Sequence, residues 1–143
     1  MGIEKAVLGE NDVQRARLST LIESGIDYSR ELGGGWPAAA ALAQMVFWDR
    51  RAAGLLHRWD VEGSLPDAVD EALLNATLLP EWSLLDPDRA AALAVAAAAQ
   101  VDATVEALDA AKADAIVMIG IQFLVNRGEH RGERLDKIER ALS

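Results

Sequence analysis

The stretch from Trp36 to Trp59, WPAAAALAQMVFWDRRAAGLLHRW, places the strongest constraint on the fold. Its apolar side chains recur at alternating steps of four and three residues: Ala41, Met45, Trp48, Ala52, Leu55 and Trp59. This spacing places them on one side of an α-helix. At 1.5 Å per residue, the helix would be roughly 35 Å long, enough to cross a whole small domain. The sequence therefore predicts a central helix, with Pro37 in its first turn because proline has no N–H to leave unpaired there.

The same kind of spacing predicts three further long helices, over about residues 11–32, 87–108 and 126–142. In the first, Gly25 lies on the apolar line, where it would let a neighbouring helix approach closely. Residues 1–10 are expected to form a loose lead-in. The helix over 87–108 begins at Asp86-Pro87-Asp88, the residue order of a capped helix start.

Alanine dominates the apolar stripe of the helix over 87–108. We expect this helix to pack against the bulky central helix, because small side chains accommodate large ones. Weaker patterns predict a loop over 60–66, a short helix over 67–78 that Pro80 ends, and helical or irregular packing over 114–125. The predicted fold is all-α, an antiparallel four-helix bundle with a short extra helix and an irregular connector. It would form a single domain over residues 1–143.

Composition excludes several classes of function. Acidic residues outnumber basic ones by 23 to 14, and the net charge of −9 would repel phosphate backbones and anionic lipid, so neither nucleic acid nor a membrane is an expected partner. The longest apolar runs fall well short of the ~20 residues that a membrane span needs. Cysteine is absent, which excludes disulfides and thiolate ligands. The first residues lack the pattern of a signal peptide, so a cytoplasmic protein is expected.

Four stretches together resemble the DinB-like superfamily of four-helix bundles, which includes thiol-dependent transferases related to mycothiol-dependent maleylpyruvate isomerase. In chain order they are GGGWPAAAALAQMVFWDRRAAGLLHRW, LLNATLLPEW, AAAAQVDATVEALD and EHRGERLDKIERAL. The resemblance covers about residues 15–142. In that superfamily, three histidines typically hold a divalent metal, one on the second long helix and two spaced four residues apart on the last.

This chain departs from the family at two of the three ligand positions. Gln44 replaces the histidine in LAQMVFWDRR, and HRGERLDKIE keeps His130 but has Arg134 at the second position. An amide is a weak ligand, and a guanidinium carries a permanent positive charge that repels a cation. The resemblance therefore implies a retained bundle without the usual metal, in which Gln44, His130 and Arg134 line a central pocket. No cofactor is expected, and His130 remains a weak candidate metal ligand.

Each of these three residues also has a purely structural interpretation. Gln44 could hydrogen-bond to a neighbouring helix, Arg134 could pair with a carboxylate, and His130 could be a partly exposed histidine without a ligand. His57 projects away from Gln44 on the same helix and should be solvated.

Two further groups of residues could belong to a site, but packing explains them better. The tryptophans could form a ligand-stacking box, although core and helix-end packing is the favoured interpretation: Trp36, Trp48, Trp59 and Trp82. The charged residues that follow Trp48 are expected to form salt bridges within or between helices: Asp49, Arg50 and Arg51.

The favoured function is that of a DinB-like bundle without the family's metal, which either binds a small ligand in the central pocket or acts as a dimeric structural or regulatory protein. A small organic anion is the expected ligand, because Arg134 can form two parallel hydrogen bonds with a carboxylate or phosphate. The alternative is an active metal- and thiol-dependent transferase or isomerase, with Zn or Ni held by His130, Gln44 and either Glu129 or Glu133. A third possibility is that the alanine-rich stripe forms a subunit interface. A homodimer is expected because symmetric pairs are the commonest assembly. Whether the protein is an enzyme stays open.

Overall fold

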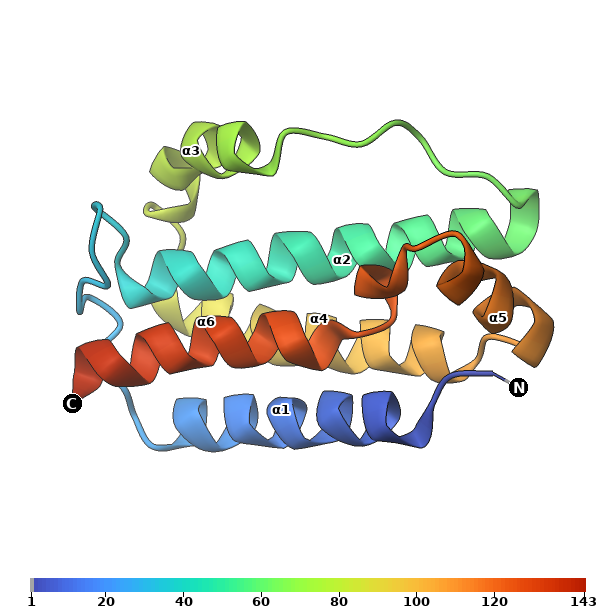
Figure 1. Ribbon diagram of the computed structural model, residues 1–143. Coiled ribbons are helices and arrows are strands. Elements are labelled where there is room, and N and C mark those ends of the chain that lie inside the picture. The colour runs from blue at the N-terminus through green and yellow to red at the C-terminus, as the bar shows by residue number, and fades with distance from the viewer. Residues whose placement is uncertain (1) are drawn as a thin grey trace.

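The structure is a computed structural model that describes residues 2–143 and is all-α, as predicted. Its four long helices are α1 (Lys5–Glu23), α2 (Ala38–Glu62), α4 (Pro87–Glu106) and α6 (Arg127–Leu142). They lie side by side, with α2 and α4 running in one direction and α1 and α6 in the other (Figure 1). α4 packs against α2 and α1, and α6 packs against the other faces of the same two helices.

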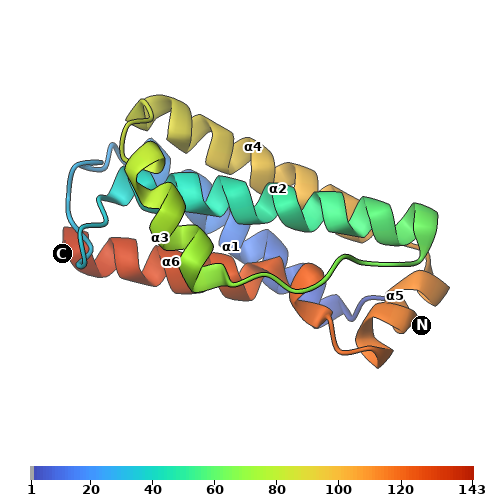
Figure 2. The ribbon, with the colours of Figure 1, turned by 90° about the horizontal axis from the view of Figure 1, so that it is seen from above.

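Three shorter elements complete the fold. They are α3 (Glu71–Trp82), α5 (Ala110–Met118) and a 3₁₀ helix, η1 (Gln122–Leu124). The linker over 63–70 returns along α2, and α3 then lies across α2 and α6 when the molecule is seen from above (Figure 2). This return lets α4 start at the same end of the molecule as α2. α5 and η1 cover the opposite end.

Side-chain caps explain where several helices begin. Asp86 accepts the backbone N–H of Arg89 at 3.1 Å, with Pro87 in the first turn, which confirms the predicted start of α4. Asp70, Asp109 and Asn126 cap α3, α5 and α6 in the same way. An aspartate or asparagine at each of these starts satisfies an amide that has no partner inside the helix.

The core is built around the contact between α2 and α4, the most extensive in the fold. Four members of the alanine-rich stripe of α4 are buried: Ala90, Ala94, Ala97 and Val101. The prediction that this helix packs on the central helix is confirmed. Because α2 already covers the stripe, the alternative that it forms a subunit interface is wrong.

The first helix lies earlier in the chain than predicted. α1 begins at Lys5, so residues 5–10 are helical and the expectation of a loose lead-in is wrong for them, while Met1 lies outside the described residues. Gly25 follows the helix at φ 75°, a left-handed conformation, and therefore does not mediate helix packing. Tyr28 and Leu32 do pack against the core, but from non-helical backbone, which explains the misleading spacing.

A close helix approach occurs instead at Gly128, where α6 meets α1. A Cβ atom at this position would lie 2.7 Å from the backbone carbonyl of Glu10. The backbone N–H of Gly128 donates to the side chain of Asn11 at 2.6 Å. Glycine is therefore needed here for space.

Other helix boundaries also differ in detail. α2 continues past Trp59 to Glu62 before Gly63 ends it in a left-handed conformation, and Pro37 precedes the helix rather than lying in its first turn. Pro80 lies inside α3 and does not end it, because the helix continues to Trp82. The segment over 114–125 forms part of α5 and η1, which confirms the expectation of helical or irregular packing.

Within residues 2–143, no single helix has both the length and the hydropathy to cross a membrane. α4 and α5 meet these requirements only when taken together, and the chain bends by 103° between them.

Candidate functional site

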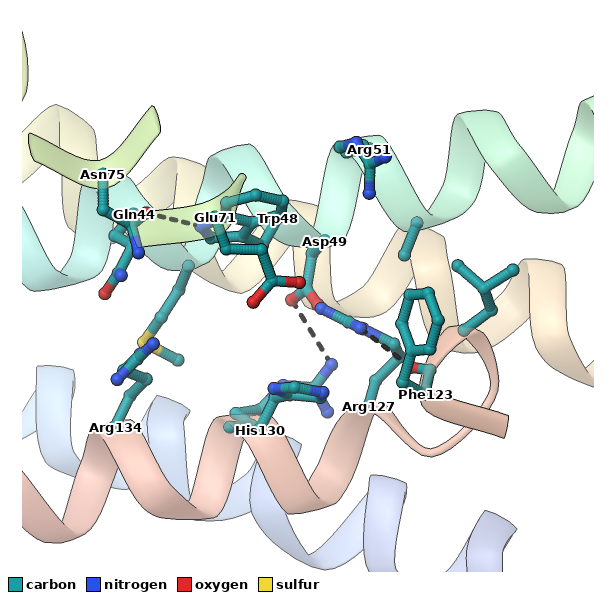
Figure 3. A pocket seen from close by; sticks show the side chains of 14 residues that line it. Gln44, Trp48, Asp49, Arg51, Glu71, Asn75, Phe123, Arg127, His130 and Arg134 are labelled. Carbon is teal, nitrogen blue, oxygen red and sulfur yellow. Dashed lines mark hydrogen bonds and ion pairs between the residues drawn. The ribbon is translucent and has the colours of Figure 1, made fainter. Parts of the chain in front are cut away.

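A small cavity of about 50 Å³ lies between α2, α3, η1 and α6 (Figure 3). The three residues that the sequence analysis placed in a pocket, Gln44, His130 and Arg134, all line it. Its other polar lining residues are Asp49, Arg51, Glu71, Asn75, Arg127 and Arg131. The described lining thus has four guanidinium groups and two carboxylates, an excess of two positive charges in a chain whose net charge is −9. The cavity is large enough for more than one water molecule, since one needs about 10–15 Å³.

The α6 side of the cavity follows from helical spacing. His130 and Arg134 are four residues apart, so they lie one turn apart on the same face of the helix. Asn126 caps the start of α6, and its side-chain amide donates to the carboxylate of Glu129 at 3.0 Å. This cap orders the first turn of α6, and the close approach at Gly128 holds that turn against α1.

Gln44 faces the cavity from α2 and is only 5% exposed. Its side chain makes no hydrogen bond with any residue in 2–143, so the expectation of a bond to a neighbouring helix is wrong. Buried amides are rarely left without a partner. The Gln44 amide is therefore positioned to bind a group that enters the cavity.

Arg134 extends from α6 toward Gln44 (Figure 3). It is half-buried, and its guanidinium forms no ion pair or hydrogen bond within the described part of the chain. The expected pairing with a carboxylate is therefore wrong. A guanidinium offers five donors in a planar arrangement that matches carboxylate and phosphate oxygens.

His130 lies at the edge of the cavity and keeps part of its ring exposed. Burial by its neighbours lowers its pKa below the ordinary value of about 6.5, and the positive charge of Arg127 lowers it further. Three carboxylates oppose this effect: Glu133, Glu71 and Glu129. The net effect favours a neutral imidazole near pH 7, able to donate one hydrogen bond and accept another.

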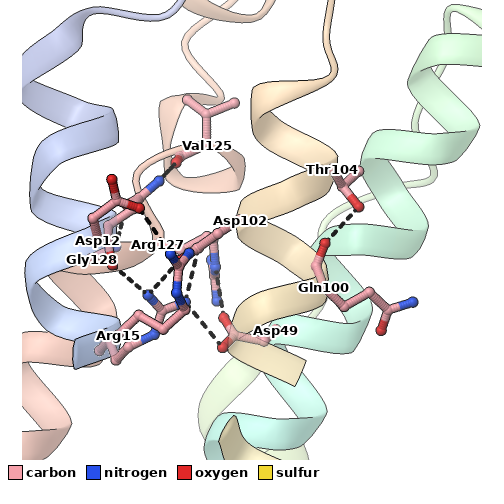
Figure 4. A network of polar contacts seen from close by, with 11 residues as sticks. Asp12, Arg15, Asp49, Gln100, Asp102, Thr104, Val125, Arg127 and Gly128 are labelled. Carbon is pink, nitrogen blue, oxygen red and sulfur yellow. Dashed lines mark hydrogen bonds and ion pairs between the residues drawn. The ribbon is translucent and has the colours of Figure 1, made fainter. Parts of the chain in front are cut away.

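A buried ionic network lies directly beside the cavity (Figure 4). Arg127 Nε and Arg131 Nη2 on α6 contact the two carboxylate oxygens of Asp49 on α2, at 3.0 and 3.4 Å. Arg131 also donates both terminal nitrogens to Asp102 on α4, each at 3.1 Å. All four side chains are buried. The pairs therefore join three of the long helices.

Residues on α1 extend this network to the fourth long helix. Arg15 Nη1 donates to Asp102 at 2.8 Å, and Arg131 Nη1 donates to the backbone carbonyl of Asn11 at 3.1 Å. The Asn11 side chain also donates to the carbonyl of Val125 at 2.9 Å. Among the side-chain nitrogen and oxygen atoms that are completely buried in the described part of the chain, Arg131 Nε alone lacks a hydrogen-bond partner. The network fixes the position of α6, and hence of His130 and Arg134.

Most of this network was missed in the sequence analysis. The signal is present in α6, where Arg127 and Arg131 are in phase with the buried Leu135 and Ile138. Arginines in phase with an apolar stripe indicate buried charges that need acidic partners. Salt bridges were expected at Asp49, Arg50 and Arg51. The expectation is confirmed for Asp49. It is wrong for Arg50 and Arg51, which form no ion pair within residues 2–143.

The tryptophans do not form one ligand box. Trp48 lines the cavity and donates its indole N–H to Asn75 at 2.8 Å, which ties α2 to α3, and Arg51 lies 5.5 Å from its ring centre. Trp36 and Trp82 contact each other at 5.8 Å outside the cavity lining.

Trp59 lies farther along α2, where it packs near α5 and its indole N–H reaches the carbonyl of Lys112 at 3.5 Å. Packing contacts therefore account for Trp59 and Trp82, whereas Trp48 also lines the cavity and Trp36 lines a neighbouring groove. His57 is exposed, as predicted.

A divalent metal does not fit the residues at the cavity. No group of three His, Cys, Asp or Glu side chains among residues 2–143 is arranged to hold one. Glu129 and Glu133, the acids considered for a rebuilt site, are exposed and do not line the cavity. The positions of Gln44 and Arg134 present an amide and a cation to this space, and neither suits a divalent cation.

No protein-family model matches the chain, and no curated protein and no solved structure was found to match it.

Proposed function

We propose that this chain is a DinB-like protein whose central cavity binds a small organic anion at the position where the family holds a metal. The observation that carries the proposal is the unpaired guanidinium of Arg134 facing the unpartnered, buried amide of Gln44. Inside a cavity, such groups need hydrogen-bond partners, which come from water or from a bound ligand. A bound anion would satisfy both at once.

The finer description of the fold belongs to the same proposal. Two long helices run in each direction, and the long linker over 63–70 carries the chain back along α2 before α4 begins. Long crossover connections of this kind occur in four-helix bundles that are not simple up-and-down arrangements. These features support a four-helix bundle with one crossover, in which α1 and α6 run antiparallel to α2 and α4.

Binding would use groups that already face the cavity. Arg134 would form two hydrogen bonds with a carboxylate or phosphate. The Gln44 amide nitrogen would donate a third hydrogen bond, and the neutral His130 ring would donate a fourth. The excess of guanidinium over carboxylate groups in the lining favours an anion. Glu71 opposes it, and thus selects for ligands that place their charge near Arg134.

Replacing Arg134 with glutamine should weaken binding of a carboxylate about 10- to 100-fold, because hydrogen bonds to charged groups contribute about 1.5–3 kcal/mol. Acetate is a suitable probe, and the indole N–H signal of Trp48, which lies in the cavity wall, reports its binding in NMR titrations.

The matched control is Arg50→Gln, which removes the same charge from an exposed position that does not line the cavity. Equal affinities for the two variants, or no saturable binding to the unmodified protein, would contradict the proposal.

A homodimer remains part of the proposal. Light scattering coupled to size-exclusion chromatography should give twice the chain mass of 15.3 kDa. Because a closed symmetric pair leaves no interface free for further chains, this mass should not increase at higher protein concentration. A mass of one chain at all concentrations would show that the dimer does not form.

A further inference from the structure

A second, larger groove opens from the cavity, with a volume of about 860 Å³. It extends over the first part of α2 to the loop that contains Glu31 and Trp36. Gln44, Asn75 and Arg134 line both spaces. The cavity and the groove therefore adjoin each other, and Arg134 lies at their shared wall.

The α6 wall of the groove has three cations at steps of three residues, Arg134, Lys137 and Arg140. None of their side chains forms an ion pair or hydrogen bond in the part of the chain that the structure describes. This is unusual in a chain with nine more acidic than basic residues. By contrast, Arg17 on α1 forms ion pairs with two neighbouring acids of α6, Asp136 at 2.7 Å and Glu139 at 2.8 Å.

The facing wall offers little negative charge and a large apolar surface. Among the described lining residues its one carboxylate is Glu31, which accepts the backbone N–H of Gly35 at 2.8 Å. Trp36, Ala76 and Leu79 supply apolar surface. The groove thus combines unpaired cations on one side with an apolar wall on the other.

We infer that the groove holds the body and the second anionic group of an elongated organic dianion, whose first anionic group binds between Arg134 and Gln44. This inference rests on the function proposed above. Arg134 and Arg140 are six residues apart on α6, which corresponds to about 9 Å along the helix axis. The ligand class is therefore a linear molecule with a carboxylate or phosphate at each end, about that distance apart, and an apolar chain between them that lies against Trp36 and Leu79.

The test compares three probes on the full chain: octanedioate, its monomethyl ester, and the shorter succinate. Extended octanedioate places its two carboxylates about as far apart as Arg134 and Arg140 are along the helix axis. The ester lacks the second charge, and succinate is too short to span that distance. We expect octanedioate to bind about tenfold more tightly than either of the others, because the second charge gains a charge-assisted hydrogen bond.

The variants identify where that advantage arises. A double variant, Lys137→Gln with Arg140→Gln, is expected to bind octanedioate and the monomethyl ester with equal affinity. The matched control, Arg50→Gln with Arg89→Gln, removes the same charge from exposed positions outside both spaces and should keep the preference for octanedioate.

The possible failures can be told apart. If the ester binds in an Arg134-dependent manner but octanedioate has no advantage, or if the advantage survives in the double variant, the groove inference is overturned and the proposed function stands. If no probe perturbs the Trp48 and His130 signals, the proposed function fails, and the inference fails with it.

Discussion

Replacing Asp102 with asparagine is expected to lower the free energy of unfolding by about 3–5 kcal/mol, the usual cost of removing one partner from a buried ion pair. Asp102 is 1% exposed and accepts hydrogen bonds from Arg131 at 3.1 Å and from Arg15 at 2.8 Å. Asparagine keeps the shape of the side chain but leaves the buried Arg131 with less compensating charge. Urea denaturation measures the loss.

The matched control for this variant is Asp136→Asn. Asp136 also binds an arginine, Arg17, at 2.7 Å, but its side chain is exposed. Exposed ion pairs contribute about 0–1 kcal/mol. If the two variants lose the same amount of stability, the buried network does not have the structural role assigned to it.

Replacing Gly128 with alanine is expected to cost about 3 kcal/mol, at the upper end of the usual penalty for overpacking. The added Cβ would lie 2.7 Å from the backbone of Glu10, which cannot move without shifting α1. The same change threatens the hydrogen bond from Gly128 N–H to Asn11. Denaturation in urea, followed by circular dichroism, measures the effect.

Two other glycines provide controls on the same helical background. Gly54 lies exposed in α2 with nothing within 4 Å of an added Cβ, so alanine there should stabilise the protein by about 0.5–1 kcal/mol. A Cβ added at Gly132 would lie 3.2 Å from the flexible end of the Gln14 side chain. Alanine there should change the free energy of unfolding by an amount between those at Gly54 and Gly128. A neutral or stabilising effect at Gly128 would show that α1 and α6 are not as closely packed as described.

The helical architecture was largely predictable because apolar spacing and capping residues are local signals. The cap at Asp86 and the packing of the α4 stripe on α2 followed directly from the sequence. α1 was misplaced because Tyr28 and Leu32 continue the helical spacing although their backbone is not helical. Packing on the core, rather than helix formation, sets the spacing of those two residues.

The sequence predicted which residues line the site, but it did not predict their hydrogen-bond and ion-pair partners. The family resemblance indicated Gln44, His130 and Arg134, and the structure brings all three to one cavity. Their bonding state could not be predicted, because it depends on which acids other helices place nearby. The acids closest in sequence, Glu129 and Glu133, lie outside the cavity lining.

The central claim is that an anion binds beside His130 and Arg134. Its most direct test is a pH titration of the two histidines by NMR with and without sulfate, whose charge is constant over the pH range in which histidines titrate. Burial and Arg127 lower the pKa of His130, so in the free protein its ring becomes protonated at a lower pH than that of an ordinary histidine. An anion bound beside it would stabilise the charged ring and raise that pKa. The affinity for the anion should therefore increase as the pH falls through the range in which His130 becomes protonated. His57, exposed on α2 away from the cavity, is the reference for general salt effects. The account predicts that sulfate shifts the titration of His130 to higher pH and leaves the signals of His57 unchanged. Equal responses of the two histidines, or no response at His130, would contradict it.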